Sequence, residues 1–219
     1  MRAPAWLTTP AGLLLGGALY GFAIGAGKNL TYAWRSAVKF PLLLLGTAVV
    51  CNLAHVMAAR FLGADLPARA VQRVNFGSFA TLAILLGSLS PVVLFLGATM
   101  PPPGPRDLGG YPLFVGINML FIAVAGALAL LHQARWLRRQ HALADATARR
   151  VLTCWLLLSL AVGGQLAFWL RPFFGIATLR GEPPFVLGDE PTVTGARNFS
   201  EVVWQFLTAA DPGDYLRGR

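Results

Sequence analysis

Charged side chains are scarce in this chain, and acids are the scarcest. Asp, Glu, Lys and Arg together make up 12% of the 219 residues, and only 9 residues are acidic. Soluble domains carry about 25% charged residues. Because 56% of the residues are apolar, the chain has too few polar side chains to hide its apolar surface from water. The composition therefore indicates a protein that has lipid as its solvent.

Motifs for catalysis or metal binding are also lacking. The two cysteines, Cys51 and Cys154, lie in separate apolar runs without a CxxC pair, which argues against a disulfide framework or a zinc site. Segment 25–28 (GAGK) is similar to the end of a phosphate-binding loop, but Phe22 and Asn29 stand where that loop needs a glycine and a hydroxyl. GxSxG and HExxH motifs are absent. The sequence predicts no catalytic residue, no cofactor, no metal and no nucleic-acid partner.

Long apolar runs are what the sequence does contain. A helix of about 20 apolar residues crosses the hydrocarbon core of a bilayer, where an open sheet edge is not tolerated. Five runs reach this length without a charged residue in their central part, and they cover residues 7–27, 40–59, 76–99, 111–131 and 151–170. We therefore predict an all-α fold, with a polytopic transmembrane helical bundle of about five spans over 1–170 and an extramembrane tail over 171–219. The first run is longer than the apolar region of a signal peptide, so we expect a retained helix.

The connections between the runs differ in character. Segment 28–39 combines three basic residues with Tyr32 and Trp34. It predicts an interfacial segment, with aromatic rings at headgroup depth and basic side chains that reach water. Segment 99–110 is a Pro/Gly loop that cannot be helical. Segment 132–150 carries five arginines and one acid, and it predicts an extension of the fourth helix out of the membrane.

Basic residues are shared unevenly between the two predicted sides of the membrane. The N-terminus, 60–74 and 132–150 place nine Lys and Arg on one side, against three in 28–39 and one in 99–110 on the other. The tail carries the remaining five, which six acids balance. Because cytoplasmic loops are enriched in Lys and Arg, we predict a cytoplasmic N-terminus and, after five spans, a periplasmic tail. The composition, rich in Ala, Gly, Arg and Leu, suggests a GC-rich bacterial genome and hence an inner membrane.

The tail contains one amphipathic helix signal, at 198–207. Asn198 stands three residues before Glu201, a capping-box variant that predicts the helix start. One apolar stripe follows at helical spacing. So short a helix is marginal alone in water, so it must lie on the bilayer, on the bundle or on a partner. The residues predicted to dock a partner are Phe199, Val203, Trp204 and Phe206.

Gly17, Gly21 and Gly25 share one face of the first predicted helix. Close van der Waals contact drives helix association in lipid, and small residues four positions apart permit it. The pattern predicts a packed helix–helix interface, with the neighbouring helix either in this chain or in another subunit.

Single polar residues interrupt the later runs. We expect these residues to form interhelical hydrogen bonds: Asn52, His55, Asn118 and Gln165. One such arrangement is a small polar cluster of all four near the middle of the membrane. Cys51 and His55 share a helical face, but a haem or metal site needs a further ligand from elsewhere. Without an intramembrane acid or lysine, proton- or ion-coupled transport lacks its usual element.

Two further features leave alternatives open. Ser88, Ser90 and Pro91 predict either a kink in the third helix or a substrate-lining break of the kind found in transporters. The arginines of 132–150 either set the topology or hold anionic lipid headgroups. The headgroup alternative concerns Arg135, Arg138 and Arg139.

Five closely spaced runs, short loops with few acids and the Ser88-Leu89-Ser90-Pro91 break give the chain a resemblance to the bacterial relatives of Yip-type five-helix integral membrane proteins. The resemblance covers roughly residues 30–170. It implies a five-helix membrane fold. Eukaryotic Yip proteins act as membrane adaptors in vesicle traffic, which implies a membrane-shaping or trafficking role. It implies no site residues, because the bacterial members generally lack a known activity.

The sequence thus favours a non-catalytic membrane protein that serves as a scaffold or accessory subunit of a larger membrane assembly. Its predicted partners are the lipid bilayer and other membrane subunits or a second copy of itself. The alternative is a small transporter or channel, with the polar residues of helices two to five lining a path.

Overall fold

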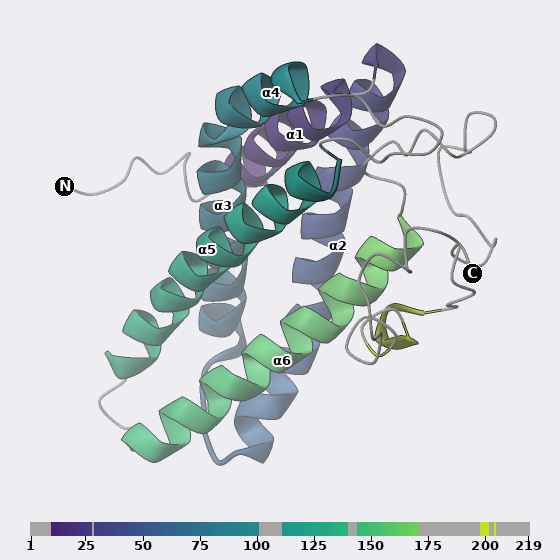
Figure 1. Ribbon diagram of the computed structural model, residues 1–219. Helices are drawn as coiled ribbons and strands as arrows, with labels where there is room; N and C mark the ends of the chain where they lie inside the picture. The colour runs from purple at the N-terminus through teal and green to yellow at the C-terminus, as the bar shows by residue number, and fades with distance from the viewer. Residues whose placement is uncertain are drawn as a thin grey trace.

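The computed structural model describes residues 10–27, 29–100, 111–139, 144–170, 198–201 and 204. Regular structure within these ranges is helical (Figure 1). The labelled helices are α1 (Pro10–Ala26), α2 (Leu30–Phe61), α3 (Ala68–Ser88), α4 (Ser90–Thr99), α5 (Tyr111–Arg138) and α6 (Asp145–Trp169). The prediction of an all-α helical fold is confirmed. Most of the predicted Pro/Gly loop and of the tail lies outside the described residues.

Three of these helices, α2, α5 and α6, are each long and apolar enough to cross a membrane. Helices α3 and α4 pass the same test together, as a pair bent by 44°. Helix α1 is apolar but has 17 residues, which reach about 26 Å at 1.5 Å per residue, less than the ~30 Å hydrocarbon core. The described helices therefore give three to four candidate spans, where the apolar runs predicted about five.

Helix α2 begins earlier than predicted. The Asn29 side chain caps it by accepting a hydrogen bond from the backbone N–H of Tyr32 at 2.8 Å. Residues 30–39, which the sequence assigned to the connection before the second run, form the first turns of α2. Trp34 is 63% exposed as predicted, but Tyr32 and Lys39 are each only 2% exposed. The reason is that α1 folds back along these turns and covers one of their faces.

Helix α2 ends in a Schellman motif. Gly63 has a φ of 79°, which glycine adopts without steric cost. The N–H of Ala64 donates to the Ala59 carbonyl at 2.8 Å, and the N–H of Gly63 donates to the Arg60 carbonyl at 3.0 Å. This turn reverses the chain into α3, so that Arg60 and Arg69 lie at the same end of the bundle.

The predicted kink in the third run is confirmed. Helix α3 ends at Ser88 and α4 starts at Ser90, with the bend at Leu89. Pro91 has no N–H to continue the helical hydrogen bonds, and the Ser88 hydroxyl donates to the Leu85 carbonyl at 2.7 Å. Helix α3 also starts before residue 76, at Ala68.

Two apolar cores lie one above the other along the bundle. The first joins α1 to parts of α2, α3, α4 and α5, and includes Leu13, Tyr20, Leu44, Leu86, Val93 and Phe114. The second joins the end of α2, the α2–α3 turn, the start of α3, the end of α5 and the start of α6. In Figure 1 these last elements meet at the end of the bundle opposite α4. The fourth predicted helix continues beyond residue 131 as far as Arg138. The prediction is wrong for residues 145–150, which form the start of α6.

Candidate functional site

A buried pair of rings joins α2 to α6. His55 and Trp155 are fully buried, and their rings stack with centroids 5.1 Å apart and an interplanar angle of 19°. The indole N–H of Trp155 donates to the His55 carbonyl at 2.9 Å, and His55 Nε2 lies 3.1 Å from the Trp155 carbonyl oxygen. Each side chain is thus bonded to the backbone of the other residue, and the pair fixes α2 against α6.

The Trp155 carbonyl determines where the imidazole proton lies. A carbonyl oxygen can only accept a hydrogen bond, so His55 Nε2 carries the hydrogen in the 3.1 Å contact. Ser159 Oγ lies 3.4 Å from the same nitrogen, which then has no lone pair to take the serine proton. This arrangement differs from a Ser–His nucleophile, in which the imidazole nitrogen accepts the serine hydrogen.

Further polar contacts surround this pair. The Asn75 side-chain amide of α3 donates to the Ala48 carbonyl of α2 at 2.9 Å, and Asn75 is fully buried. The Cys51 thiol faces the Leu158 carbonyl of α6 at 3.8 Å. Cys51 and Cys154 are both free thiols. The polar side chains that meet between α2, α3 and α6 are thus Cys51, His55, Asn75, Trp155 and Ser159.

Three buried acceptor atoms in this region have no hydrogen-bond partner among the described residues: His55 Nδ1, Asn75 Oδ1 and Asn52 Oδ1. With the imidazole proton on Nε2, all three atoms are acceptors. Leaving such a group unpaired costs about 1–3 kcal/mol. A donor such as a buried water molecule would satisfy them.

A second polar contact joins α1 to α5. The Tyr20 hydroxyl donates to Asn118 Oδ1 at 2.9 Å, and the Asn118 amide donates to the Phe114 carbonyl at 2.8 Å. Tyr20 also packs edge-on against Phe40 of α2, with ring centroids 5.1 Å apart. Tyr20 and Asn118 are both fully buried, so this contact fixes α1 inside the bundle.

The four polar residues proposed from the sequence have different partners. His55 bonds to Trp155, Asn118 bonds to Tyr20, and Gln165 accepts the backbone N–H of Phe199 at 3.3 Å. Asn52 Oδ1 is one of the unpaired acceptors. The hydrogen bonds of these residues therefore belong to separate contacts.

Sequence reasoning missed Tyr20, Asn75, Trp155 and Ser159. An aromatic residue inside an apolar run gives no local sign that its polar atom bonds to another helix. Asn75 precedes the predicted start of the third run by one residue and was counted outside it. Asn75 lies within the bundle because α3 starts at Ala68, which only the structure shows.

The glycine face of α1 lies against α2 of the same chain. A Cβ atom at Gly21 would meet the Ser36 backbone and lie 2.8 Å from Phe40 Cβ, and one at Gly25 would meet the Tyr32 backbone. At Gly17 the nearest atom would be the Pro41 Cα, at 3.2 Å. On an adjoining face, Gly16 lies against the Ala83 backbone of α3. The interface that the glycine spacing predicted is therefore filled within the chain.

The start of the tail helix follows the predicted capping-box variant. The Glu201 backbone N–H donates to Asn198 Oδ1 at 2.9 Å. The Asn198 side-chain amide donates to Glu201 Oε1, also at 2.9 Å. This capping prediction is confirmed.

The described part of the tail helix contacts α6. Phe199 is half-buried, and its ring lies so close to Gly164 that any Cβ atom there would overlap with it. Trp204 is 68% exposed. The side chains of Val203 and Phe206, also proposed for partner docking, lie outside the described residues.

Basic residues gather where α2 and α5 end and where α3 and α6 begin. We call this region the arginine end; its described members are Arg60, Arg69, Arg73, Arg135, Arg138, Arg139, Arg149 and Arg150. The residues proposed for lipid headgroups are all exposed: Arg135 and Arg138 on the last turns of α5, and Arg139 directly after the helix. The two connections whose arginines set the predicted orientation thus lie on one side.

Comparisons of the chain with protein-family models, with curated proteins and with solved structures find no match. Within the described residues, no group of three or more His, Cys, Asp or Glu side chains is placed to hold a metal ion. Cys51 and His55, which share a helical face, therefore have no third ligand of these types in that part of the chain. The functional proposal rests on the helices and contacts described above.

Proposed function

We propose that the chain is a non-catalytic integral membrane protein that acts as a scaffold or accessory subunit of a larger membrane assembly. The observation that carries the proposal is the reciprocal bonding of His55 and Trp155, which uses the imidazole Nε2–H to join two helices. The Tyr20–Asn118 contact joins α1 and α5 in a similar way. Polar side chains used in this manner stabilise a helix arrangement.

In the proposed topology the chain lies in a bacterial inner membrane with the arginine end in the cytoplasm. The gathering of the arginines of the α2–α3 and α5–α6 connections supports this orientation, because cytoplasmic loops are enriched in Arg and Lys. Helix α6 starts at the arginine end, so one crossing by α6 gives a periplasmic tail. A fifth crossing by α1, whose 17 residues are shorter than the hydrocarbon core, needs a locally thinner bilayer. The end of α6 that contacts Phe199 then lies at the periplasmic side.

The surface that we assign to a partner is the outer face of α6 with the docked tail segment. The glycine face of α1 is filled within the chain, so partner contacts must use another surface. Leu160 of α6 is 59% exposed, and Trp204 of the tail is 68% exposed. We assign these exposed apolar side chains to the surface that another transmembrane helix covers.

The unpaired acceptors His55 Nδ1, Asn75 Oδ1 and Asn52 Oδ1 favour a second candidate, a small transporter or channel. A path for a polar solute needs hydrogen-bonding groups inside the membrane, and these three atoms are available to a donor. The two candidates make different predictions for a purified protein in sealed vesicles. A transporter moves a solute without any other subunit, whereas a scaffold leaves the vesicle sealed.

The test of the scaffold proposal uses a photo-crosslinking amino acid in place of Leu160 on α6. The matched control carries it at Leu120 on α5, which is 60% exposed. We expect one defined membrane protein, or a second copy of the chain, to be captured at Leu160 and not at Leu120. Equal capture at both positions, or lipid adducts alone, would reject α6 as a subunit interface. Solute exchange in vesicles that contain the purified chain, altered by His55→Leu, would favour the transporter.

A further inference from the structure

Two hollows flank the first turns of α6 at the arginine end. One is a cavity of about 230 Å³ between α5 and α6, lined by residues that include Arg138, Asp145, Arg149 and Leu152. The other is a more open groove of about 540 Å³, lined by Leu62, Ala146, Arg149, Arg150, Thr153, Cys154 and Leu157. Arg149 takes part in both hollows.

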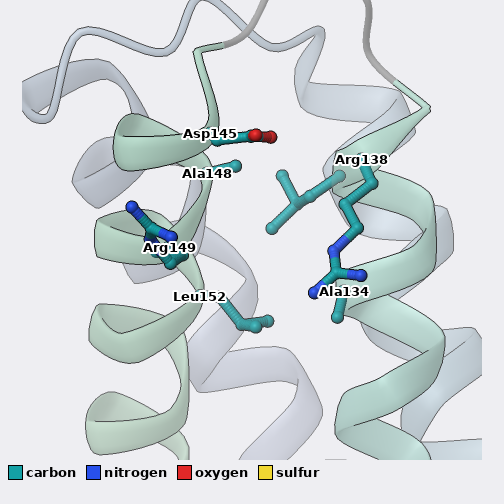
Figure 2. Close-up of a pocket in the computed structure, with 7 residues that line it drawn as sticks. Ala134, Arg138, Asp145, Ala148, Arg149 and Leu152 are labelled. Carbon is teal, nitrogen blue, oxygen red and sulfur yellow. The ribbon is translucent and has the colours of Figure 1, made fainter.

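The two hollows differ in charge. In Figure 2 the Arg138 side chain extends down beside Ala134, and the Asp145 carboxylate lies near the top of the cavity. A carboxylate at this position opposes the entry of an anion. The described lining of the groove has no acid, and it carries the two adjacent arginines Arg149 and Arg150. The groove is therefore the hollow that suits a negatively charged group.

The lining of the groove is mostly apolar, and its two charged residues lie at one end. Arg149 and Arg150 lie in the second turn of α6, and the later lining residues Thr153, Cys154 and Leu157 carry no charge. Leu157 is eight residues after Arg149, which corresponds to about 12 Å along the helix axis. Leu62, at the end of α2, also lines the groove. A ligand that fits must therefore be anionic at one end and apolar over roughly this length.

We propose that this groove binds one anionic phospholipid from the leaflet at the arginine end. The guanidinium groups of Arg149 and Arg150 hold the phosphate, because the planar donor pairs of Arg match phosphate oxygens. One acyl chain lies along Thr153, Cys154 and Leu157. The inference rests on the proposed membrane insertion of α6, and it places the headgroup site on α6 instead of on Arg135 and Arg139. Basic pockets at the cytoplasmic ends of transmembrane helices suit such lipids.

The experiment measures lipid binding to the full chain in a non-ionic detergent by native mass spectrometry. The probes are dioleoyl phosphatidylglycerol, dioleoyl phosphatidylcholine and glycerol 3-phosphate. We expect the wild-type chain to bind the phosphatidylglycerol in preference to the phosphatidylcholine. The double substitution Arg149→Gln with Arg150→Gln should weaken phosphatidylglycerol binding about tenfold or more, because two favourable basic contacts are lost.

The matched control is Arg69→Gln with Arg73→Gln, which removes the same charge from exposed positions of α3 at the same end. It should change the affinity less than about threefold, because a diffuse surface charge is largely screened by salt. An equal loss in both double variants would overturn the groove as the site. Equal binding of phosphatidylcholine would overturn the charge requirement.

A third variant, Cys154→Phe, fills the apolar part of the groove and keeps both arginines. This variant should weaken phosphatidylglycerol binding. If the arginine double variant does not fold, the Cys154→Phe variant tests whether the groove is the lipid site. Unchanged binding to a folded Cys154→Phe chain would overturn the acyl-chain contact. Binding of glycerol 3-phosphate as tight as that of the lipid would identify a free-phosphate site instead. A chain that remains soluble without detergent would reject the membrane proposal itself, which is a separate outcome.

Discussion

His55 on α2 and Trp155 on α6 exchange hydrogen bonds with each other's backbone carbonyl groups, at 3.1 Å and 2.9 Å. Their rings also stack, so three contacts fix the rotation of one helix against the other. In lipid the hydrophobic effect does not drive helices together, so packing and directional bonds set their arrangement. Trp155 belongs as well to the apolar core at the arginine end. The pair therefore links the polar contact between α2 and α6 to the packing of this end.

The first prediction concerns this pair. Trp155→Phe keeps an aromatic ring against His55 but removes the donor to the His55 carbonyl. We expect a loss of stability of about 1–2 kcal/mol, the range found for interhelical hydrogen bonds in membranes. The measurement is unfolding of the purified protein in mixed micelles as the denaturing detergent fraction rises. Trp169→Phe on the same helix, at a position 51% exposed, is the control and should change stability by less than about 0.5 kcal/mol. Equal effects would show that the indole N–H has no special role.

The second prediction concerns the glycine face. Gly21→Ala places a Cβ atom against the Ser36 backbone and the Phe40 side chain, so α1 must shift. We expect a loss of about 1–3 kcal/mol, as for other overpacked sites. Gly126→Ala on α5 is the matched control, since nothing lies within 4 Å of its added Cβ. Unfolding in mixed micelles measures both variants.

The more severe Gly21→Leu separates the two interpretations of this face. If the face packs against α2, the variant loses stability in the purified chain, with no other subunit present. If it packs on a partner, the purified chain keeps its stability and only co-purification decreases. The second outcome would contradict the intrachain contact of Gly21 with Ser36 and Phe40.

The third prediction is a coupling between α1 and α5. In a double-mutant cycle with Tyr20→Phe and Asn118→Leu, the two losses should not add, because both variants remove the same 2.9 Å hydrogen bond. We expect a coupling free energy of about 0.6–1.7 kcal/mol. A control cycle combines Tyr20→Phe with Ser78→Ala, because the Ser78 hydroxyl bonds within its own helix to the Val74 carbonyl. Additive losses in the first cycle would show that the Tyr20–Asn118 hydrogen bond does not stabilise the packing of α1 against α5.

The fourth prediction concerns topology. Helix α6 runs from the arginine end to the turn that contacts Phe199, so Arg138 and Trp204 should lie on opposite sides of the membrane. Single cysteines at these positions, in a chain without Cys51 and Cys154, should react with an impermeant thiol reagent from opposite sides. Labelling of both from the same side would contradict the crossing of α6. A cysteine in place of Arg73, which belongs to the arginine end, is the control. It should react with the reagent from the same side as the cysteine in place of Arg138.

The sequence predicted those features that depend on one segment at a time. Apolar runs longer than a bilayer core indicated membrane-crossing helices, and Pro91 with its neighbouring serines indicated the bend between α3 and α4. The Asn198–Glu201 spacing predicted the start of the tail helix. These features follow from local chemistry. A helix cap, a missing backbone N–H and the length of an apolar run do not depend on residues distant in the sequence.

Errors arose where another helix changed the surroundings of a residue. Lys39 and Tyr32 are of types that reach the headgroups when exposed, but both are buried in the helical bundle. The glycine spacing indicated a close helix–helix contact but not whether the neighbouring helix belongs to this chain. The reason is that α2 and a helix of another subunit present similar backbone surfaces. Asn75 lay outside the predicted run, because its burial comes from the packing of α3 in the bundle.

The sequence by itself determined the helical class, the apolar runs and the basic character of two connections. The tertiary structure decided that α1 returns along the first half of α2, that His55 meets Trp155, and that Tyr20 meets Asn118. The physical reason is that apolarity and chain length are properties of a segment, whereas the partner of a buried polar atom depends on helix rotation and depth. In lipid, where apolar surface alone does not select a neighbour, close packing and hydrogen bonds across the whole interface set both.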